Sequence, residues 1–145
     1  MKTLCFDMDG TIADFYGVEN WLAFLLSEDT TPYAVAKPLC NFSIFARFLN
    51  RYQKQGGKIG IISWGSKNST TDFLERVATA KKKWLKKHLP SVNWDFIHVV
   101  PYGTPKEKYK TEKNAVLFDD EEKNRLEWNG TAYNVNNILE VLRNL

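Results

Sequence analysis

Residues 3–12 are Thr3-Leu4-Cys5-Phe6-Asp7-Met8-Asp9-Gly10-Thr11-Ile12, a short apolar run that leads into two aspartates, a glycine and a threonine. Such a run is typical of a strand that is buried on both faces of a parallel sheet. Asp7 and Asp9 would then lie at its carboxyl end, which is where open α/β sheets bind ligands. Two crowded carboxylates repel each other unless a cation lies between them, and their oxygen atoms suit Mg²⁺. The alternative interpretation is a polar turn after the strand, because Asp-Gly is a common turn dipeptide.

The rest of the chain alternates between strand and helix patterns. Apolar runs and helical spacing of apolar residues locate these elements. Further strands are expected at 58–63, 94–100, 115–118 and 131–135, and helices at 21–26, 39–55, 70–89 and 136–145. Residues 27–38 are rich in turn formers and are expected to be an irregular connection. The alternation predicts an α/β fold with a parallel sheet and helices on both faces.

The composition limits the class of protein. A length of 145 residues predicts one domain, and 14% aromatic residues indicate a substantial hydrophobic core. No apolar run is long enough to span a membrane, and we expect the first ten residues to form a strand rather than a signal peptide. Cys5 and Cys40 do not make a disulfide framework or a zinc site, so the default expectation is a reducing, cytoplasmic location.

Lysines concentrate in two segments, residues 81–87 and residues 106–113. Either segment could attract a phosphate-rich partner, although a net charge of +3 does not by itself indicate nucleic-acid binding. We interpret the first segment, which includes Lys81, Lys82 and Lys83, as the solvated face of a helix. The second lies between two predicted strands and close to their carboxyl ends.

Polar residues also follow two of the later strands. Ser63 ends one of them and opens into a loop of small residues, where its hydroxyl and the amides of Trp64 and Gly65 would bind phosphoryl oxygens. On its own, Ser63 fits an ordinary strand-end serine equally well. Asp119 and Asp120 follow the strand at 115–118, and two adjacent carboxylates there are costly unless a cation or hydrogen bonds compensate them.

In this order, the aspartate loop, the serine, a lysine and the acidic pair resemble the haloacid dehalogenase-like (HAD) superfamily of phosphohydrolases. The resemblance spans residues 4–124 but rests on few residues. It implies a Rossmann-like three-layer α/β/α core and a Mg²⁺-dependent phosphomonoester hydrolase that works through an aspartyl-phosphate. It also implies a short flap after Ile12.

The resemblance assigns a role to each acid. Asp7 would be the nucleophile, because a carboxylate that attacks phosphorus divides one hard displacement into two easier ones. Asp9 would protonate the leaving oxygen, help to activate water, and lend its backbone carbonyl to Mg²⁺. Asp120 would bind the metal, with Asp119 behind it or near the lysine. Thr11 would hold the loop through local hydrogen bonds and would be one of the substrate-binding residues, with Ser63, Trp64 and Gly65.

The catalytic lysine is needed to neutralise charge in the transition state and to reduce repulsion between Asp7 and the phosphate. Lys106 is preferred because it comes just after the turn formers Gly103, Thr104 and Pro105. Lys108 and Lys110 remain alternatives, whereas Lys113 is expected at the surface. Asn124, four residues after Asp120, weakly matches a further polar position of the family.

A closer likeness is to the 5′(3′)-deoxyribonucleotidase branch of that superfamily. Residues 6–15, 83–89 and 117–120 look like the corresponding segments of those enzymes. Only about fifty residues separate Asp9 from Ser63, so the cap that encloses nucleotides in that branch is expected to be absent or reduced to about residues 18–38. We therefore expect a single HAD-like domain over 1–145 with a minimal cap.

Three functions follow from the sequence. The first is a phosphatase for a phosphorylated small molecule, with a nucleotide as the leading substrate. The second is a regulatory protein that binds phosphate or metal without turnover. The third is a phosphatase for polynucleotide ends, which an open site and the lysines favour and the modest net charge disfavours. No membrane partner is expected, and the sequence leaves the oligomeric state open.

Overall fold

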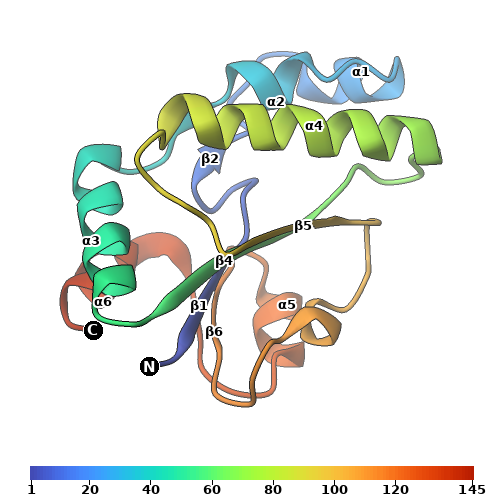
Figure 1. The fold of residues 1–145 in the computed structure, drawn as a ribbon. Helices are drawn as coiled ribbons and strands as arrows, with labels where there is room; N and C mark the ends of the chain where they lie inside the picture. Colours follow the sequence, from blue (N-terminus) through green and yellow to red (C-terminus); the bar gives the residue numbers. More distant parts are fainter.

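The computed structural model describes all residues from 1 to 145 and contains a five-stranded parallel sheet (Figure 1). The strands lie in the order β5-β4-β1-β6-β7. Their bounds are β1 Thr3–Phe6, β4 Lys58–Trp64, β5 Phe96–Val100, β6 Val116–Phe118 and β7 Ala132–Tyr133. β1 is the central strand, and it pairs in parallel with β4 on one side and β6 on the other. The predicted α/β fold with a parallel sheet is confirmed.

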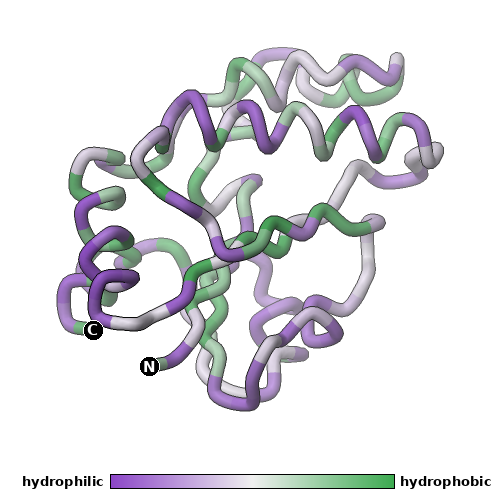
Figure 2. The backbone as a smooth tube through the Cα atoms, in the orientation of Figure 1, coloured by the Kyte–Doolittle hydropathy of each residue, from purple (hydrophilic) through white to green (hydrophobic).

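Side chains alternate across the sheet, and each face is covered. Leu4 and Phe6 of β1 belong to a large core with residues of α3 (Phe42–Lys54), α4 (Thr71–His88) and α6 (Ile138–Arg143). Cys5 points to the other face and packs with Trp128, which follows α5 (Glu122–Glu127), and beside Tyr109 of η1 (Lys106–Tyr109). Figure 2 shows hydrophobic residues continuous along the central strands and alternating with polar ones along α4. The result is a three-layer, Rossmann-like arrangement.

Local signals fix the ends of the two long helices, α4 within one residue of the predicted bounds and α3 with a start three residues later than predicted. The side chain of Thr70 caps α4 by accepting a hydrogen bond from the amide of Phe73 at 3.1 Å. Asn41 caps α3 in the same way through the amide of Ile44. Gly56, with φ of +95°, follows the carboxyl end of α3 in the left-handed conformation that favours glycine.

The segment 27–38 is more regular than the sequence suggests, and the prediction of an irregular connection is wrong there. It contains α2 (Thr31–Val35) and β3 (Lys37–Pro38), and β3 pairs antiparallel with β2 (Ala13–Asp14). The turn formers start a helix, because Asp29 accepts hydrogen bonds from the amide and hydroxyl of Thr31 and Pro32 lies in the first turn. The segment packs on α4 through Tyr33, which lies with Phe15, Phe73 and Val77.

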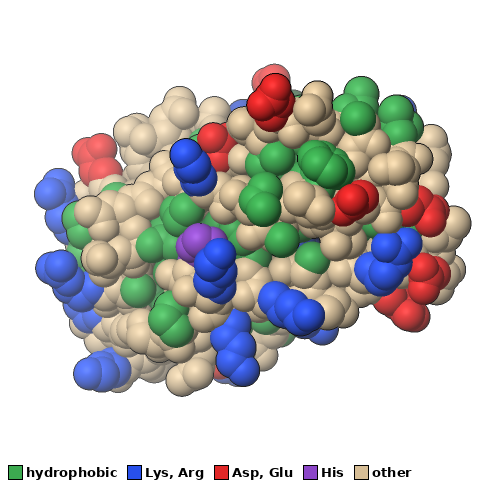
Figure 3. Space-filling view, turned by 90° about the horizontal axis from the view of Figure 1, so that it is seen from above, with side chains coloured by type: hydrophobic (Ala, Val, Ile, Leu, Met, Phe, Trp, Pro, Cys, Tyr) green, Lys and Arg blue, Asp and Glu red, His purple; other side chains and the backbone are tan.

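The helix α1 (Trp21–Leu26) has the predicted bounds and lies beside α2 at the top of Figure 1. Figure 3 views this side of the molecule from above and shows lysine and arginine side chains spread among neutral and hydrophobic ones. No helix combines the length and the apolar character that crossing a bilayer requires.

The packing of Phe6 offers a test of the fold. Its ring lies 5.4 Å from Phe45 of α3 and 4.8 Å from Phe118 of β6, measured between centroids, and it is fully buried. Phe6→Ala is expected to lower the free energy of unfolding by about 3–5 kcal/mol, measured by denaturant titration. Leu126→Ala removes a side chain of a residue that is 77% exposed and should change it by less than about 0.5 kcal/mol. Equal effects of the two changes would contradict this packing.

Candidate functional site

Two neighbouring strands bring the acids together. β1 and β6 pair so that Phe6 lies opposite Phe118, and the next residues of both strands are aspartates. Carboxylate oxygens of Asp7, Asp119 and Asp120 lie within 4.8 Å of one another, although more than 100 residues of chain separate the first from the other two. The site therefore lies at the carboxyl edge of the sheet, as the sequence predicts.

Lys106 lies between two of these carboxylates. Its Nζ is 2.9 Å from Oδ1 of Asp7 and 2.7 Å from Oδ2 of Asp119, and the residue is 3% exposed. η1 carries it into the site from the connection between β5 and β6. The structure thus places the preferred lysine of the sequence analysis beside Asp7.

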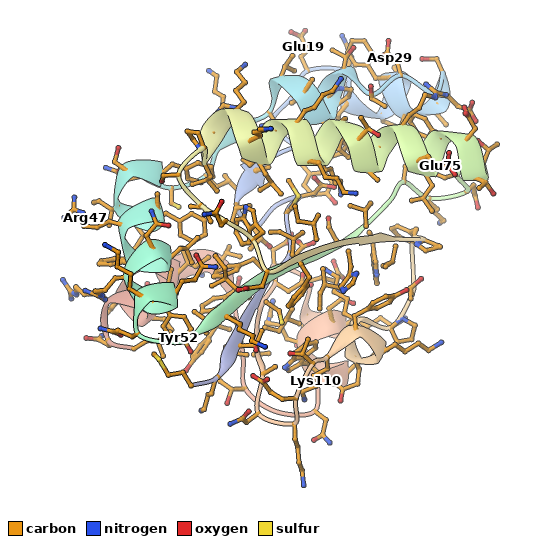
Figure 4. All side chains as sticks on the ribbon, viewed as in Figure 1. Glu19, Asp29, Arg47, Tyr52, Glu75 and Lys110 are labelled. Carbon is orange, nitrogen blue, oxygen red and sulfur yellow. The ribbon has the colours of Figure 1, made fainter.

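The alternative lysines lie elsewhere. Lys108 and Lys113 are exposed. Lys110, labelled in Figure 4, donates a hydrogen bond to the carbonyl of Asn129, and its Nζ lies 4.8 Å from the centre of the Trp128 ring. Lys110 therefore contacts Asn129 and Trp128 and does not contact the four aspartates.

Gly10 and Thr11 hold the two acidic loops together. Thr11 donates its hydroxyl hydrogen to Oδ2 of Asp7 at 2.9 Å and accepts a hydrogen bond from the amide of Asp120 at 3.2 Å. Gly10 has φ of +79°, and a Cβ there would lie 2.3 Å from Oδ2 of Asp120. The turn therefore needs glycine at this position. Thr11 is buried and acts between the loops rather than at the surface of a pocket.

Asp119 and Asp120 lie in different surroundings. Asp119 is fully buried, and its carboxylate accepts hydrogen bonds from Lys106, from the amide of Glu121 and from Nδ2 of Asn124. Asp120 is half-buried and lines a pocket together with Asp7 and Asp9. Asn124 is buried in the site, in agreement with its weak match in the sequence.

Lys81 is a site residue that the sequence analysis missed. The interpretation of residues 81–87 as a solvated helix face holds for Lys82, Lys83, Lys86 and Lys87, which are exposed, and is wrong for Lys81, which is 1% exposed. Its Nζ lies 3.0 Å from Oδ2 of Asp9 and 2.7 Å from Oγ of Ser63. The available signal was its spacing, because Lys81 follows Phe73 and Val77 at intervals of four on the inner face of α4.

The loop after β4 is predicted from the sequence to bind phosphoryl oxygens, and the structure contradicts this for one of its amides. The Gly65 amide donates to the carbonyl of Val100 at 2.7 Å, so it is not free to bind a phosphoryl oxygen, and that prediction is corrected. The reason is that β5 runs beside this loop and takes the hydrogen bond. Ser63 is fully buried and accepts from Lys81, and its proposed contact with phosphate stays a prediction. Trp64 lines the pocket.

The pocket above the acids has a volume of about 80 Å³. Its floor is formed by the aspartates and Lys106, and Tyr16, Trp64 and Tyr102 surround it. Tyr16 and Tyr102 are 55% and 53% exposed, and the rings of Trp64 and Tyr102 lie 4.9 Å apart between centroids. Pockets that enclose whole small molecules are several times larger, on the order of 300–1,000 Å³. Only a small polar group fits this one.

Burial and mutual repulsion raise the pKa of three of the four acids, and nearby lysines lower the pKa of the fourth. Burial raises the pKa of Asp119 to about 6 and that of Asp120 to about 7, and the negative charge of Asp7 adds to both shifts. Burial and Asp7 also raise the pKa of Asp9, which Lys81 only partly offsets. Burial, the largest single effect, also acts to raise the pKa of Asp7, but Lys106, Lys81 and a hydrogen bond with Asp120 together outweigh it, so the pKa of this carboxyl lies below its usual range.

The donor set fits a cation. The site contains four carboxylates and two ammonium groups, so it carries about two negative charges in excess when all are ionised. The carboxylates are those of Asp7, Asp9, Asp119 and Asp120, and the ammonium groups are those of Lys81 and Lys106. Oδ1 of Asn124 is buried beside them without a hydrogen-bond partner. The acidic triad of Asp7, Asp119 and Asp120 could therefore bind a metal ion, and oxygen donors of this kind suit hard divalent cations.

Comparisons with known proteins support the fold and do not identify a function. No protein-family model and no curated protein matches the sequence. Among solved structures, a chain of a Pnkp1/Rnl/Hen1 complex is similar, with a TM-score of 0.58 and 18% identity. The match covers 92% of this chain and 45% of that chain, so the protein spans less than half of the length of the chain it resembles. At this identity the likeness supports the Rossmann-like fold.

Metal binding can be measured without any assay of activity. Because Asp120 is the acid of the triad without a lysine partner, Asp120→Asn should weaken Mg²⁺ binding most directly. At 100 times its Kd, Mg²⁺ should stabilise the wild type by about 2.7 kcal/mol, seen as a rise in Tm. The rise should be lost in Asp120→Asn and kept in Glu122→Gln, a change of the same charge at an exposed position. An unchanged rise in Asp120→Asn would exclude this site.

Proposed function

We propose that this protein is a Mg²⁺-dependent phosphomonoester hydrolase that works through an aspartyl-phosphate on Asp7. The observation that supports it best is the position of Asp7, whose carboxylate lines a small pocket between Lys106 and the acid of Asp120. A buried carboxylate kept ionised by an adjacent ammonium is suited to nucleophilic attack. The resemblance to the HAD superfamily in the sequence points to the same chemistry.

The proposed reaction consists of two displacements at phosphorus, with Asp7 as the nucleophile of the first and Asp9 as the group that transfers protons in both. Asp7 forms a bond to phosphorus while the bond to the leaving oxygen breaks, and Asp9 gives that oxygen a proton. Water then attacks phosphorus, Asp9 takes up a proton from it, and Asp7 is released. Asp7, Asp120 and the backbone carbonyl of Asp9 would hold Mg²⁺, with Asp119 behind them; the bound ion would offset negative charge on the phosphoryl oxygens.

Lys106 offsets the negative charge around Asp7, the proposed nucleophile. Its contacts with Asp7 and Asp119 offset the repulsion that two buried carboxylates exert on each other and on an incoming phosphate. Thr11 fixes the other oxygen of Asp7, so the carboxylate has a defined orientation before the substrate arrives.

The size of the pocket limits which part of the substrate can enter. About 80 Å³ accommodates a phosphoryl group, and the rest of the substrate would lie at Tyr16, Trp64 and Tyr102. Exposed aromatic rings favour a leaving group with a flat face, and a nucleotide is the leading candidate. A second hollow, of about 320 Å³, also reaches Tyr102 and is lined by Lys67, Ser69 and Thr70.

A polynucleotide end is the second candidate. The open surroundings of the pocket and the polar hollow beside Tyr102 place no limit on the length of the leaving group. Lys67 is exposed there and could contact a further phosphate. A protein that binds phosphate without turnover would have the same pocket, and only an activity measurement separates it from the enzyme.

The first test is hydrolysis of 4-nitrophenyl phosphate with and without Mg²⁺. Turnover should require the metal, and Asp7→Asn should reduce kcat by about three orders of magnitude or more, because the covalent route loses its nucleophile. The control is Asp72→Asn, the same change at an exposed position of α4. Metal-independent turnover, or full activity of Asp7→Asn, would contradict the proposal, and the absence of turnover across a panel of phosphomonoesters would favour the binding protein.

The second test separates the two substrate classes. Mononucleotides and phosphorylated oligonucleotides are compared over a series of salt concentrations, and we expect the mononucleotide to be hydrolysed with a weak salt dependence. Tyr102→Ala should raise KM for the mononucleotide on the order of tenfold through the loss of stacking. If the oligonucleotide is preferred and its kcat/KM falls steeply with salt, the polynucleotide end is the substrate instead.

A further inference from the structure

All three donors of Lys81 are used inside the protein. Its Nζ donates to Oδ2 of Asp9 at 3.0 Å, to Oγ of Ser63 at 2.7 Å and to the backbone carbonyl of Trp64 at 2.7 Å. An ammonium group has three N–H bonds, so none remains for a substrate. The side chain is also 1% exposed. Any effect of Lys81 on a reaction must therefore act through one of its partners.

Two of these partners hold Lys81 in place. Ser63 and Trp64 belong to β4, an interior strand of the sheet. The ring of Tyr33 lies 5.2 Å from Nζ, measured to its centroid, and adds a further contact from α2. Lys81 itself comes from the buried face of α4. The ammonium is thus fixed by rigid elements on several sides.

Asp9 depends on this ammonium for its orientation. The contact of Oδ2 with Lys81 is the one hydrogen bond that the Asp9 side chain makes within the protein. Oδ1 has no partner and is not enclosed, and Asp9 lines the pocket beside Asp7. Oδ1 is therefore the oxygen of Asp9 that no group of the protein holds. Without Lys81, repulsion from Asp7 would act on a carboxylate that nothing else holds.

We propose that Lys81 is a positioning residue that fixes the Asp9 carboxylate with Oδ1 facing the leaving group. The inference rests on the proposed function, in which Asp9 gives a proton to the leaving oxygen. An alkoxide leaving group needs that proton, whereas 4-nitrophenolate is stable enough to leave without it. Loss of Lys81 should therefore harm the two classes of substrate unequally.

The experiment compares an alkyl phosphate with 4-nitrophenyl phosphate. Lys81→Met should lower kcat/KM for the alkyl phosphate about 100-fold or more and for the aryl phosphate by less than about tenfold, because kcat/KM reports the step in which the leaving group departs and not the later attack of water. The matched control is Lys82→Met, which changes the next, exposed residue of α4 and should leave both rates unchanged. Equal losses on the two substrates, or no loss on either, would overturn the proposal.

A double variant shows whether Lys81 acts through Asp9. Asp9→Asn should show the same selective loss on the alkyl phosphate. Adding Lys81→Met to Asp9→Asn should then reduce the rate little further, because residues that act as one unit are not additive. Full additivity of the two losses would mean that Lys81 acts by another route and would overturn the proposal.

A crystal structure of Lys81→Met gives a measurement that needs no activity. The Asp9 carboxylate should leave its place beside the pocket, and an unmoved carboxylate would overturn the proposal. Ser63→Ala, which removes one anchor of Lys81 and little volume, serves the same comparison if Lys81→Met does not fold. A wild type that hydrolyses neither phosphate would refute the proposed function, whereas this comparison would still show whether Lys81 positions Asp9.

Discussion

A buried ammonium between two buried carboxylates holds the candidate site together. Lys106 reaches Asp7 and Asp119 at 2.9 and 2.7 Å, and these acids directly follow the neighbouring strands β1 and β6. A charge removed from water is stable only where its partners compensate it, so the positions of all three residues depend on one another. The arrangement also keeps Asp7 ionised in surroundings that would otherwise favour its neutral form.

The second buried lysine, Lys81, compensates a different acid of the site from those that Lys106 contacts. Lys81 reaches Asp9 from α4, on the side of the sheet opposite to η1, which carries Lys106. Each ammonium compensates the acids nearest to it, and Asp120 is left without a lysine. The uncompensated acid lies at the pocket, where a divalent cation would complete the balance of charge. Under the proposed function, this division of charge would let Asp7, Asp9 and Asp120 serve as nucleophile, proton donor and metal-binding acid within one small volume.

The same packing explains why the site is open. The short segment with α1 and α2 rests on α4 through Tyr33 and leaves only three aromatic side chains around the pocket. Under the proposed function, a site of this shape would enclose the phosphoryl group and leave the rest of a substrate largely outside the pocket. Selectivity for a leaving group would then come from contacts at Tyr16, Trp64 and Tyr102 rather than from enclosure. The single-domain organisation with a minimal cap remains a prediction from the sequence.

The amino-acid sequence alone predicts the five strands of the parallel sheet, the long helices and the acidic residues at the strand ends, because apolar periodicity and helix caps are local properties and parallel strands end at one edge. It also favoured Lys106, through the turn formers before it. Only the tertiary structure decided that Lys81 is buried, that the Gly65 amide is taken by Val100 and that residues 31–35 form a helix on α4. The burial of a lysine and the partner of an amide depend on residues far away in the chain. The spacing of Lys81 after Phe73 and Val77 is compatible with the inner face of α4, but a lysine there is expected to be solvated until Asp9 and Ser63, brought there by other strands, are seen to make its charge stable.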